Sequence, residues 1–366
     1  MPETLERTYK FCTLKLVAFT KIATVKFSKF VNLLRFIVDI TKYPIYLIIF
    51  VIWVIYNFFS FINPVFDFIS SIPAFFYITG VVLLYFTELI LRVKPKYIIN
   101  FTLCLLFLFN IGLEFNNNNI FQNSDGKTLK ICSLNTKYYF DYVNSKEEAL
   151  KKLKDLNCDV YTFSEIWGVP RYELLKNLIV DINEKFPEHI YYSRNAEFVT
   201  FSKYNIKETK VSYYEGFLRT DIEFEGKLYS VYNVHIWNPL FGRQHFRFNE
   251  KLSEEKKSFS AYKIRKMQIE ELVADINSEG ENNRNTVITG DFNSMPHHKI
   301  TREKSYGRKI KRLNYQGISF TRTFNTEFRA IRIDYTFVSN NVKVLKYDIV
   351  CDKEISDHCM QVVQVN

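Results

Sequence analysis

The sequence predicts an α/β protein in which transmembrane helices precede a domain of alternating strands and helices. Three long apolar runs lie within residues 43–113, which is rare in soluble chains. After residue 128, short apolar segments that predict strands alternate with segments of helical periodicity. Several of the predicted strands end in Asn, Asp, Glu or His, and we expect the functional site at these ends.

The composition favours an anionic partner. The chain has 49 Lys and Arg against 39 Asp and Glu, a net charge of +10. This balance suits phosphate esters, nucleic acid or anionic lipid, without choosing among them. The six cysteines form no CxxC pair and no Cys/His metal spacing, so a zinc site is not expected and no specific disulfide is predicted.

Residues 1–42 are basic, with eight Lys or Arg against three acidic residues. Apolar residues lie between the charges, a pattern typical of an amphipathic helix on an anionic membrane surface. A solvated basic arm is the alternative. The segment is too long for the start of a signal peptide, and no small-residue cleavage site follows the first apolar run.

The membrane anchor is predicted for residues 43–115, with three transmembrane helices. The uncharged runs are Tyr43–Phe66, Phe68–Thr87 and Tyr97–Leu113. Each meets the roughly 17–25 residues that cross a bilayer, the last only just. Buried helices of a soluble domain are the alternative.

Charge predicts the orientation of this anchor. The basic N-terminus and the loop Arg92–Lys96 favour the cytoplasm. Three crossings would then place everything after about Phe115 outside it. The Asn-rich residues 116–127 are interpreted as a linker to a domain formed by residues 128–366.

This domain begins with a strand–helix–strand unit. The segment Lys130–Asn135 predicts a strand, Lys146–Leu156 a helix with one apolar face, and Asp159–Glu165 a second strand. Such a unit favours parallel neighbours with a right-handed crossover, which would place Asn135 and Glu165 at one sheet edge.

Another predicted strand, Lys227–Ile236, places Asn233 and His235 on one face. A histidine on a strand is also a common structural residue, which is the alternative for His235. The following segment, Trp237–Tyr262, is long for a loop and mixes aromatic with basic residues, so it is a candidate to hold substrate or lipid headgroups.

The segment Val287–Ser294, with the sequence VITGDFNS, predicts a buried strand followed by a close turn at Gly290. Asp291 and Asn293 would point to the same side, where they could hold a phosphate, a metal or an attacking water. An ordinary strand-to-turn junction is the alternative. Two further polar strand ends follow, Asp334 and the run Ser356–His358.

Taken together, these motifs resemble the endonuclease/exonuclease/phosphatase superfamily, from about Thr128 to the C-terminus. The resemblance rests on seven motifs in order: Asn135, Ser164-Glu165, Ser202-Lys203-Tyr204, Asn233-Val234-His235, Gly290-Asp291-Phe292-Asn293, Ile333-Asp334-Tyr335 and Ser356-Asp357-His358. Ser164 stands where the family commonly has Gln. The resemblance implies a four-layer α/β sandwich of the DNase I-like type, with two sheets face to face and helices outside.

The resemblance also implies a metal and phosphate site. Glu165 would be the principal ligand of Mg²⁺ or Mn²⁺, with Asn135 close by. Asp291 would orient or deprotonate the attacking water, while Asn293 and His235 would contact the phosphate.

The same resemblance implies that His358, paired with Asp357, completes the acid–base group. Asp334 would be structural or would support His358. All expected catalytic positions are filled, which argues against an inactive relative.

The implied activity is hydrolysis of a lipid phosphate or pyrophosphate at the outer face of a membrane. The overall plan resembles membrane-bound bacterial lipid-pyrophosphate phosphatases, and Asn233-Val234-His235 is similar to neutral sphingomyelinases. A surface-anchored nuclease and a non-catalytic lipid- or protein-binding scaffold are the alternatives. Phosphatase versus phosphodiesterase, the oligomeric state and the substrate itself stay open.

Overall fold

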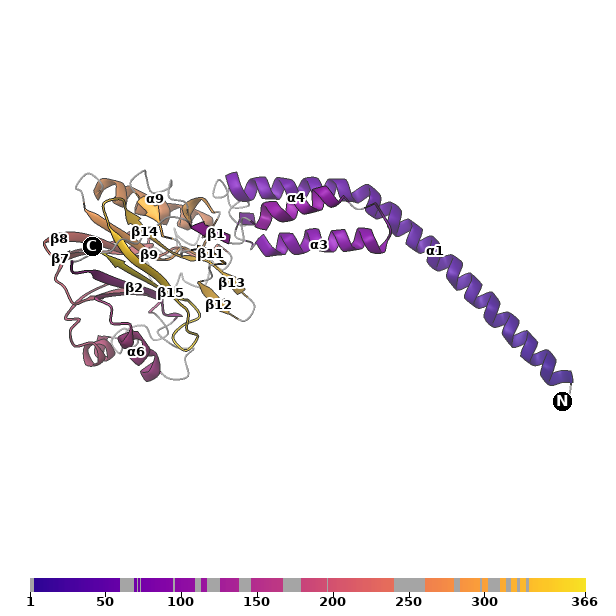
Figure 1. The fold of residues 1–366 in the computed structure, drawn as a ribbon, viewed down its shortest axis with the longest axis horizontal. Helices are drawn as coiled ribbons and strands as arrows, with labels where there is room; N and C mark the ends of the chain where they lie inside the picture. Colours follow the sequence, from indigo (N-terminus) through magenta and orange to yellow (C-terminus); the bar gives the residue numbers. More distant parts are fainter. Residues whose placement is uncertain are drawn as a thin grey trace, which may run out of the picture. The chain divides into compact units, whose positions relative to one another are not determined.

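The computed structural model of the chain is shown in Figure 1. The residues that it describes are 3–59, 69–70, 72, 74–94, 96–108, 113–116, 126–137, 146–166, 179–195, 197–239, 261–279, 284–296, 298–301, 310–313, 317–320, 323–326 and 329–366. The chain divides into two compact units, Met1–Trp53 with Ala74–Phe107, and Val54–Pro73 with Leu108–Asn366.

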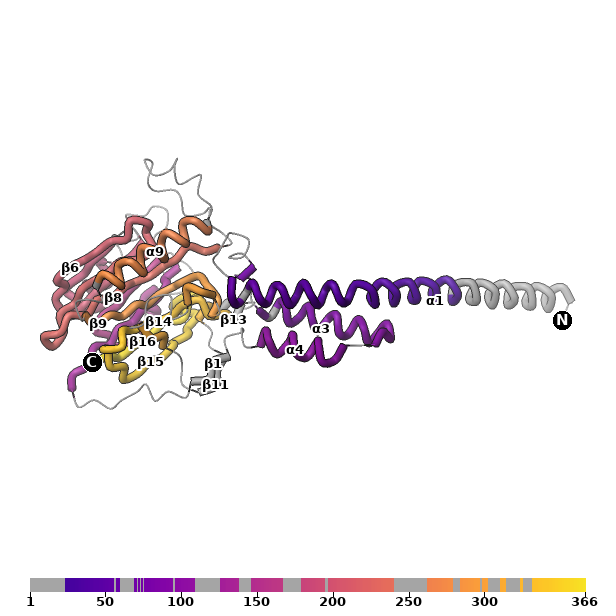
Figure 2. Tube along the Cα trace, turned by 90° about the horizontal axis from the view of Figure 1, so that it is seen from above, coloured from indigo at the N-terminus to yellow at the C-terminus, as the bar shows by residue number. Residues whose placement is uncertain are grey.

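The first unit contains three helices, α1 (Glu3–Val54), α3 (Ala74–Ile90) and α4 (Tyr97–Leu108). Within this unit, α3 and α4 lie beside the second half of α1 in both ribbon views (Figure 1, Figure 2). Tyr46 from α1, Glu88 from α3 and Asn100 from α4 form a buried hydrogen-bonded group. Most other large apolar side chains described on these helices are exposed.

The helices differ from the predicted anchor. Helix α1 continues without a break through residues 42 and 43 and passes into a π-helical turn at Ile55–Phe59. Among the described residues, only Thr24–Phe59 is long and apolar enough to cross a membrane. Helix α4 has 12 residues, which span about 18 Å and not the roughly 30 Å of a hydrocarbon core. Three transmembrane helices therefore stay a prediction.

The third apolar run ends differently from its prediction. Its helix stops at Leu108, and Leu113 begins the short strand β1 (Leu113–Asn116) instead of ending a helix. Strand β1 pairs with β11 (Gly317–Phe320). A pairing between residues so distant in the sequence cannot be inferred from hydropathy.

The second unit is built on two six-stranded sheets. The first has the order β15-β16-β2-β3-β5-β4 and the second β10-β14-β9-β8-β7-β6. The bounds of the first are β2 Leu129–Asn135, β3 Val160–Ser164, β4 Tyr191–Asn195, β5 Phe198–Ser202, β15 Val344–Val350 and β16 Met360–Val365. Those of the second are β6 Ile206–Val211, β7 Phe217–Phe224, β8 Lys227–His235, β9 Asn285–Asp291, β10 Ile310–Arg312 and β14 Asp334–Ser339. Strands β12 (Phe324–Thr326) and β13 (Arg329–Ile331) pair separately.

The two sheets pack face to face with helices outside. Leu129, Ile131 and Val160 of the first sheet share one buried cluster with Val231 and Val287 of the second. Alternate residues of the same strands face outward, as the two-residue period of a strand requires. The outer face of the first sheet packs against α6 (Lys146–Asp155) and residues 179–186, and that of the second against α9 (Ala261–Glu279). The predicted four-layer α/β sandwich is thus confirmed.

Strands β2 and β3 are parallel neighbours, as the strand–helix–strand unit predicted, and Asn135 lies opposite Ser164. Strands β8 and β9 are also parallel, and His235 lies opposite Asp291. The two sheets are further joined by Asn233, whose side-chain NH₂ donates to the Phe163 carbonyl at 2.8 Å.

Several predicted segments lie partly outside the described residues. They are residues 117–125 of the linker and residues 240–260 of the long loop. The sequence also predicts a helix around Arg171–Asn183 and a basic surface stretch, Arg302–Arg312, of which residues 171–178 and 302–309 lie outside the described residues.

Two disulfides lie in the second unit, although the sequence predicted no specific pair. Cys132 of β2 bonds to Cys158, just before β3, and Cys351 bonds to Cys359 at the turn between β15 and β16. Both pairs bring neighbouring strands together, so they depend on strand order, which cysteine spacing alone does not reveal.

Candidate active site

The predicted site residues meet at the ends of strands from both sheets. The antiparallel register of β14 and β9 places Asp334 opposite Asp291, which in turn lies opposite His235. Gly290 permits the close β8–β9 approach, because a Cβ there would lie 2.1 Å from the Val234 carbonyl oxygen. Its φ of +139° is also one that other residues rarely adopt.

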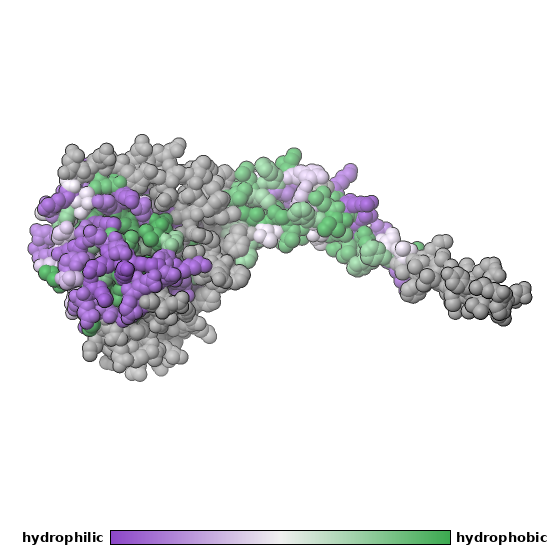
Figure 3. Space-filling view, turned by 60° about the horizontal axis from the view of Figure 1, so that its bottom comes forward, coloured by the Kyte–Doolittle hydropathy of each residue, from purple (hydrophilic) through white to green (hydrophobic). Residues whose placement is uncertain are grey.

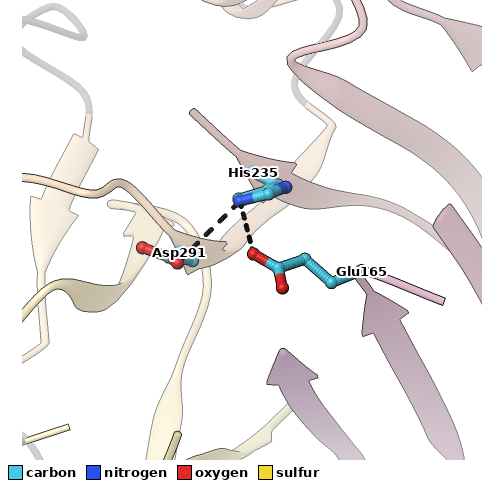
Figure 4. Close-up of side chains that lie close together, drawn as sticks. All are labelled: Glu165, His235 and Asp291. Atoms are coloured by element: carbon cyan, nitrogen blue, oxygen red, sulfur yellow. Dashed lines mark ion pairs between the residues drawn. The ribbon is translucent and has the colours of Figure 1, made fainter. Parts of the chain in front are cut away.

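His235 lies between two glutamates, Glu165 and Glu197. Figure 4 shows His235 with Glu165 and Asp291. Its Nε2 is 3.1 Å from Glu165 Oε1 and its Nδ1 is 2.9 Å from Glu197 Oε1. Burial opposes the charged imidazole, but the two carboxylates outweigh it and hold the pKa of His235 well above its usual value. Burial alone would raise the pKa of Glu165, yet the bond to His235 lowers it to about 2. The pair is therefore an imidazolium and a carboxylate near neutral pH.

Glu197 was not predicted from the sequence. It is buried and directly precedes β5, with no motif around it. The only signal is an acidic residue beside the fully apolar strand start Phe198-Val199, and such junctions are common. Its contact with His235 spans 38 positions in the sequence.

His358 is paired with Asp334, which corrects the pairing with Asp357 implied by the resemblance. Its Nδ1 lies 3.1 Å from both carboxylate oxygens of Asp334. Burial opposes the imidazolium, but the charge and hydrogen bond of Asp334 raise the pKa of His358 to about 10. Asp357 forms an ion pair with Lys137 instead. Adjacent residues in a turn point their side chains apart, whereas Asp334 reaches His358 from β14.

Asp291 lies between these two histidines. Its Oδ2 is 4.0 Å from His235 Nε2 and 3.9 Å from His358 Nε2. The side-chain NH₂ of Asn135 donates to the same oxygen at 3.2 Å, and the backbone N–H of Asn293 donates to Oδ1 at 2.7 Å. Burial, together with the nearby Asp334 charge, raises the pKa of Asp291 to about 7 despite the two cations. A carboxylate with this pKa is suited to exchange a proton near neutral pH.

Asn293 is fixed by its surroundings. Its side-chain NH₂ donates to the Ile236 carbonyl at 2.9 Å, and its Oδ1 accepts a bond from Asn238 at 3.1 Å. The ends of β8 and β9 are thereby joined next to Asp291.

Arg265 of α9 strengthens this junction and was also not predicted. Its fully buried guanidinium donates to the Trp237 carbonyl, to the Asn293 carbonyl at 3.3 Å and to Ser294 Oγ at 2.9 Å. One helical side chain thus holds both strand ends in place.

The donor set fits a hard divalent cation. Ligand atoms of Glu165, His235 and Asp291 lie within 4.8 Å of one another. Because His235 is held as an imidazolium, the carboxylate oxygens are the available donors, and oxygens are what Mg²⁺ and Mn²⁺ prefer.

Comparison with known proteins identifies one family. The sequence profile described as "Endonuclease/Exonuclease/phosphatase family" matches residues 132–358. This range includes every predicted site residue. A search of curated proteins gives no match.

Several solved structures are similar to this chain. Truncated TDP2 from Caenorhabditis elegans is 15% identical, with 65% of this chain and 97% of that chain covered and a TM-score of 0.45. An endonuclease/exonuclease/phosphatase family protein from Leptotrichia buccalis is 14% identical, with 65% and 99% covered and a TM-score of 0.44. A mutant beta toxin from Staphylococcus aureus with bound magnesium ions is 17% identical, with 65% and 99% covered and a TM-score of 0.42. At such low sequence identity, the similarity concerns the fold alone and does not indicate a substrate for this chain.

Proposed function

Because the chain belongs to the endonuclease/exonuclease/phosphatase family, whose members are metal-dependent phosphoesterases, we propose that it hydrolyses a lipid phosphate or pyrophosphate outside the cytoplasm, using Mg²⁺ or Mn²⁺. The observation that supports this most is the buried Asp291 between two histidines, each held by its own carboxylate. One proton acceptor and two imidazolium groups in one place suit phosphoester hydrolysis.

In this proposal Asp291 accepts the proton of the attacking water, while Asn293 and Asn135 keep its carboxylate in place. The water oxygen forms a bond to phosphorus as the bond to the leaving oxygen breaks. His235, held by Glu197, would donate from Nε2 to a phosphoryl oxygen in place of Glu165 and so stabilise the developing charge. His358, oriented by Asp334, gives its proton to the leaving oxygen. A divalent cation held by Glu165, with Asn135 close by, would neutralise charge on the phosphoryl oxygens.

A lipid substrate is supported by the first unit. Hydrophobic side chains gather over its helices in Figure 3. A tethered enzyme meets a lipid substrate at a high effective concentration, since both are confined to the bilayer. The sphingomyelinase-like motif Asn233-Val234-His235 keeps a phosphodiester headgroup among the candidates.

A location outside the cytoplasm is supported by two kinds of observation. The N-terminal segment and the Arg92–Lys96 loop are basic, which favours the cytoplasm for both. Three crossings would place both basic segments in the cytoplasm and the second unit outside. A single crossing by α1 would also place the second unit outside, but the Arg92–Lys96 loop would then lie outside as well. The two disulfides of this unit are also typical of oxidising compartments.

The proposed orientation can be tested with reporter fusions after Val365. A reporter that matures only outside the cytoplasm is expected to be active, and one that works only inside is expected to be silent. The opposite result would show that the domain is cytoplasmic and would exclude an external lipid substrate.

The proposed activity can be tested on the full-length chain in detergent, with Mg²⁺ or with EDTA. The substrates are a polyprenyl pyrophosphate, sphingomyelin, a phosphoinositide and plasmid DNA. We expect metal-dependent release of phosphate or headgroup from one lipid, with the DNA intact and with activity lost in Glu165→Gln.

Two other outcomes would contradict the proposal. Nicked DNA with untouched lipids would identify a surface nuclease, which the net charge of +10 would favour through phosphate contacts. Lipid binding without hydrolysis of any of the four substrates would identify a non-catalytic scaffold. The intact carboxylate–histidine pairs argue against this outcome.

A further inference from the structure

The middle of α1 meets the loop between α3 and α4 at one end of the first unit (Figure 1, Figure 2). Arg35 Nε of α1 donates to the Leu91 carbonyl, just past the end of α3, at 2.5 Å. About two turns further along α1, Lys42 is only 2% exposed and forms an ion pair with Asp39. Basic residues of α1 and those of the α3–α4 loop therefore lie at the same end of this unit.

Two ammonium groups approach one aromatic ring at this end. Nζ of Lys42 is 5.3 Å from the centroid of the Tyr43 ring, and Nζ of Lys96 is 5.4 Å from the same centroid. The face of an aromatic ring attracts a cation at such distances, but two like charges also repel each other. Tyr43 is 51% exposed, so this pair of charges reaches the surface of the unit. An anion bound beside the ring would relieve the repulsion.

The acidic residues nearby do not balance this charge. Residues 35–43 and 88–100 contain two carboxylates, Asp39 and Glu88, against five cations, which are Arg35, Lys42, Arg92, Lys94 and Lys96. Asp39 is the ion-pair partner of Lys42. Within the described part of the chain, the ammonium of Lys96 makes no ion pair with a carboxylate. This end of the first unit is therefore positively charged.

Glu88 is directed away from the two ammonium groups, into the unit. It is fully buried and accepts hydrogen bonds from the Tyr46 hydroxyl at 2.9 Å, the Asn100 side-chain NH₂ at 3.3 Å and the backbone N–H of Lys96 at 3.4 Å. The backbone contact lies at the start of α4, where the helix dipole favours a carboxylate. Glu88 thus joins the three helices, and its charge is used inside the unit.

Apolar side chains continue directly from the charged end. Leu47 and Ile48 of α1 are 64% and 57% exposed, and Ile98 and Phe101 of α4 are 83% and 70% exposed. Exposed tyrosines mark the boundary between the charged and apolar parts, with Tyr97 58% exposed beside Tyr43 in this respect. Tyrosine is enriched where protein passes from lipid headgroups into the hydrocarbon region. A ligand that fits this surface has an anionic head and apolar chains.

We propose that Lys42, Lys96 and the Tyr43 ring form a binding site for the headgroup of an anionic phospholipid, whose acyl chains lie on the exposed apolar side chains of α1 and α4. Basic groups between helices at the level of the headgroups bind such lipids. A zwitterionic lipid fits less well, because its own cation is repelled by the two ammonium groups. The inference goes beyond the proposed function, since it rests on the proposed membrane location and needs no hydrolysis.

The test measures lipid binding to the full-length protein in detergent with EDTA, by native mass spectrometry. Phosphatidylglycerol and phosphatidylcholine with identical acyl chains are compared. We expect tighter binding of phosphatidylglycerol, and in Lys96→Met this affinity should fall roughly fivefold, the contribution of one lysine near an anionic lipid surface. The phosphatidylcholine affinity should change little. Lys96→Arg, which keeps the charge, should restore most of the phosphatidylglycerol affinity.

Asp39→Asn should have the opposite effect. The phosphatidylglycerol affinity is expected to rise about two- to fivefold, because Lys42 loses a carboxylate that competes with the lipid. A variant that only disturbs helix packing would lower the affinity instead. Opposite signs in Lys96→Met and Asp39→Asn therefore separate a headgroup site from a general loss of structure.

Lys29→Met is the matched control. Lys29 is an exposed lysine on the same helix, and it lies about 20 Å from Lys42 along α1. The substitution removes the same charge and should change the phosphatidylglycerol affinity less than twofold.

Three results would overturn the inference. Equal binding of the two lipids, or equal losses in Lys29→Met and Lys96→Met, would show that the basic residues act only through their overall charge. A lower affinity in Asp39→Asn would show that the residues support the helix packing. Displacement of phosphatidylglycerol by an equal concentration of glycerol phosphate, which has the headgroup without acyl chains, would show a site for free anions and not for a lipid.

Discussion

Replacing Asp334 with Asn is expected to lower kcat by about 10²–10⁴-fold, because His358 loses the carboxylate that orients it and holds its proton. The same substitution should lower the pKa of His358 from about 10 toward its usual value near 6.5. Asp357→Asn leaves the Asp334–His358 pair intact and should lower this pKa much less. The titration of the His358 imidazole by NMR measures both variants directly.

Stability gives an independent check of the same pair. The pKa of His358 is higher in the folded protein than in the unfolded chain, so protonation favours folding. This stabilisation is fully present below pH 6.5 and is lost as the pH rises toward 10. The Tm difference between wild type and Asp334→Asn should therefore shrink over that range. Two results would instead support the pairing of His358 with Asp357 that was expected from the sequence. One is a Tm difference that does not change with pH, and the other is a larger decrease of the His358 pKa in Asp357→Asn than in Asp334→Asn.

Replacing Gly290 with Ala is expected to destabilise the second unit by more than about 3 kcal/mol, which is large for a single methyl group. The added Cβ would meet the Val234 carbonyl at 2.1 Å, and the backbone has a φ of +139°. The parallel pairing that places His235 opposite Asp291 would have to open, so activity should fall with stability. Thermal unfolding of the purified full-length protein measures the effect.

Gly226 provides the matched control for this prediction. It also has a positive φ, 68°, but nothing lies within 4 Å of its added Cβ. Gly226→Ala should cost only about 1 kcal/mol of backbone strain. Equal losses of stability in the two variants would show that strain alone, and not the close approach of β8 and β9, makes Gly290 necessary.

The sequence predicted those parts of the site that lie next to a strand in the chain. Asn135, Glu165, His235 and Asp291 each end an apolar run, and the pairing of parallel strands brings such ends together. The layered sandwich was predicted through the resemblance of these motifs to a known superfamily, and the pattern of apolar segments alone indicated only alternating strands and helices.

Partners that come from distant elements were not predicted. Glu197 contacts His235, which is 38 positions away in the sequence, and Arg265 contacts Trp237, which is 28 positions away. The sequence around Glu197 and Arg265 contains no motif. The choice between Asp334 and Asp357 as partner of His358 depends on side-chain direction, which adjacency in the sequence does not determine. Likewise, hydropathy could not show that the apolar run ending at Leu113 leaves its helix at Leu108 and enters a strand.

Because Arg265 is buried at the ends of two strands, the geometry of the site depends on α9, a helix that contributes no reacting group. The Arg265 guanidinium lies in the second turn of α9 and spans the ends of β8 and β9. Separating these three elements would leave a buried cation without its acceptors, at a cost on the order of 3 kcal/mol. Arg265 therefore couples the position of α9 to the strand ends that carry His235 and Asp291.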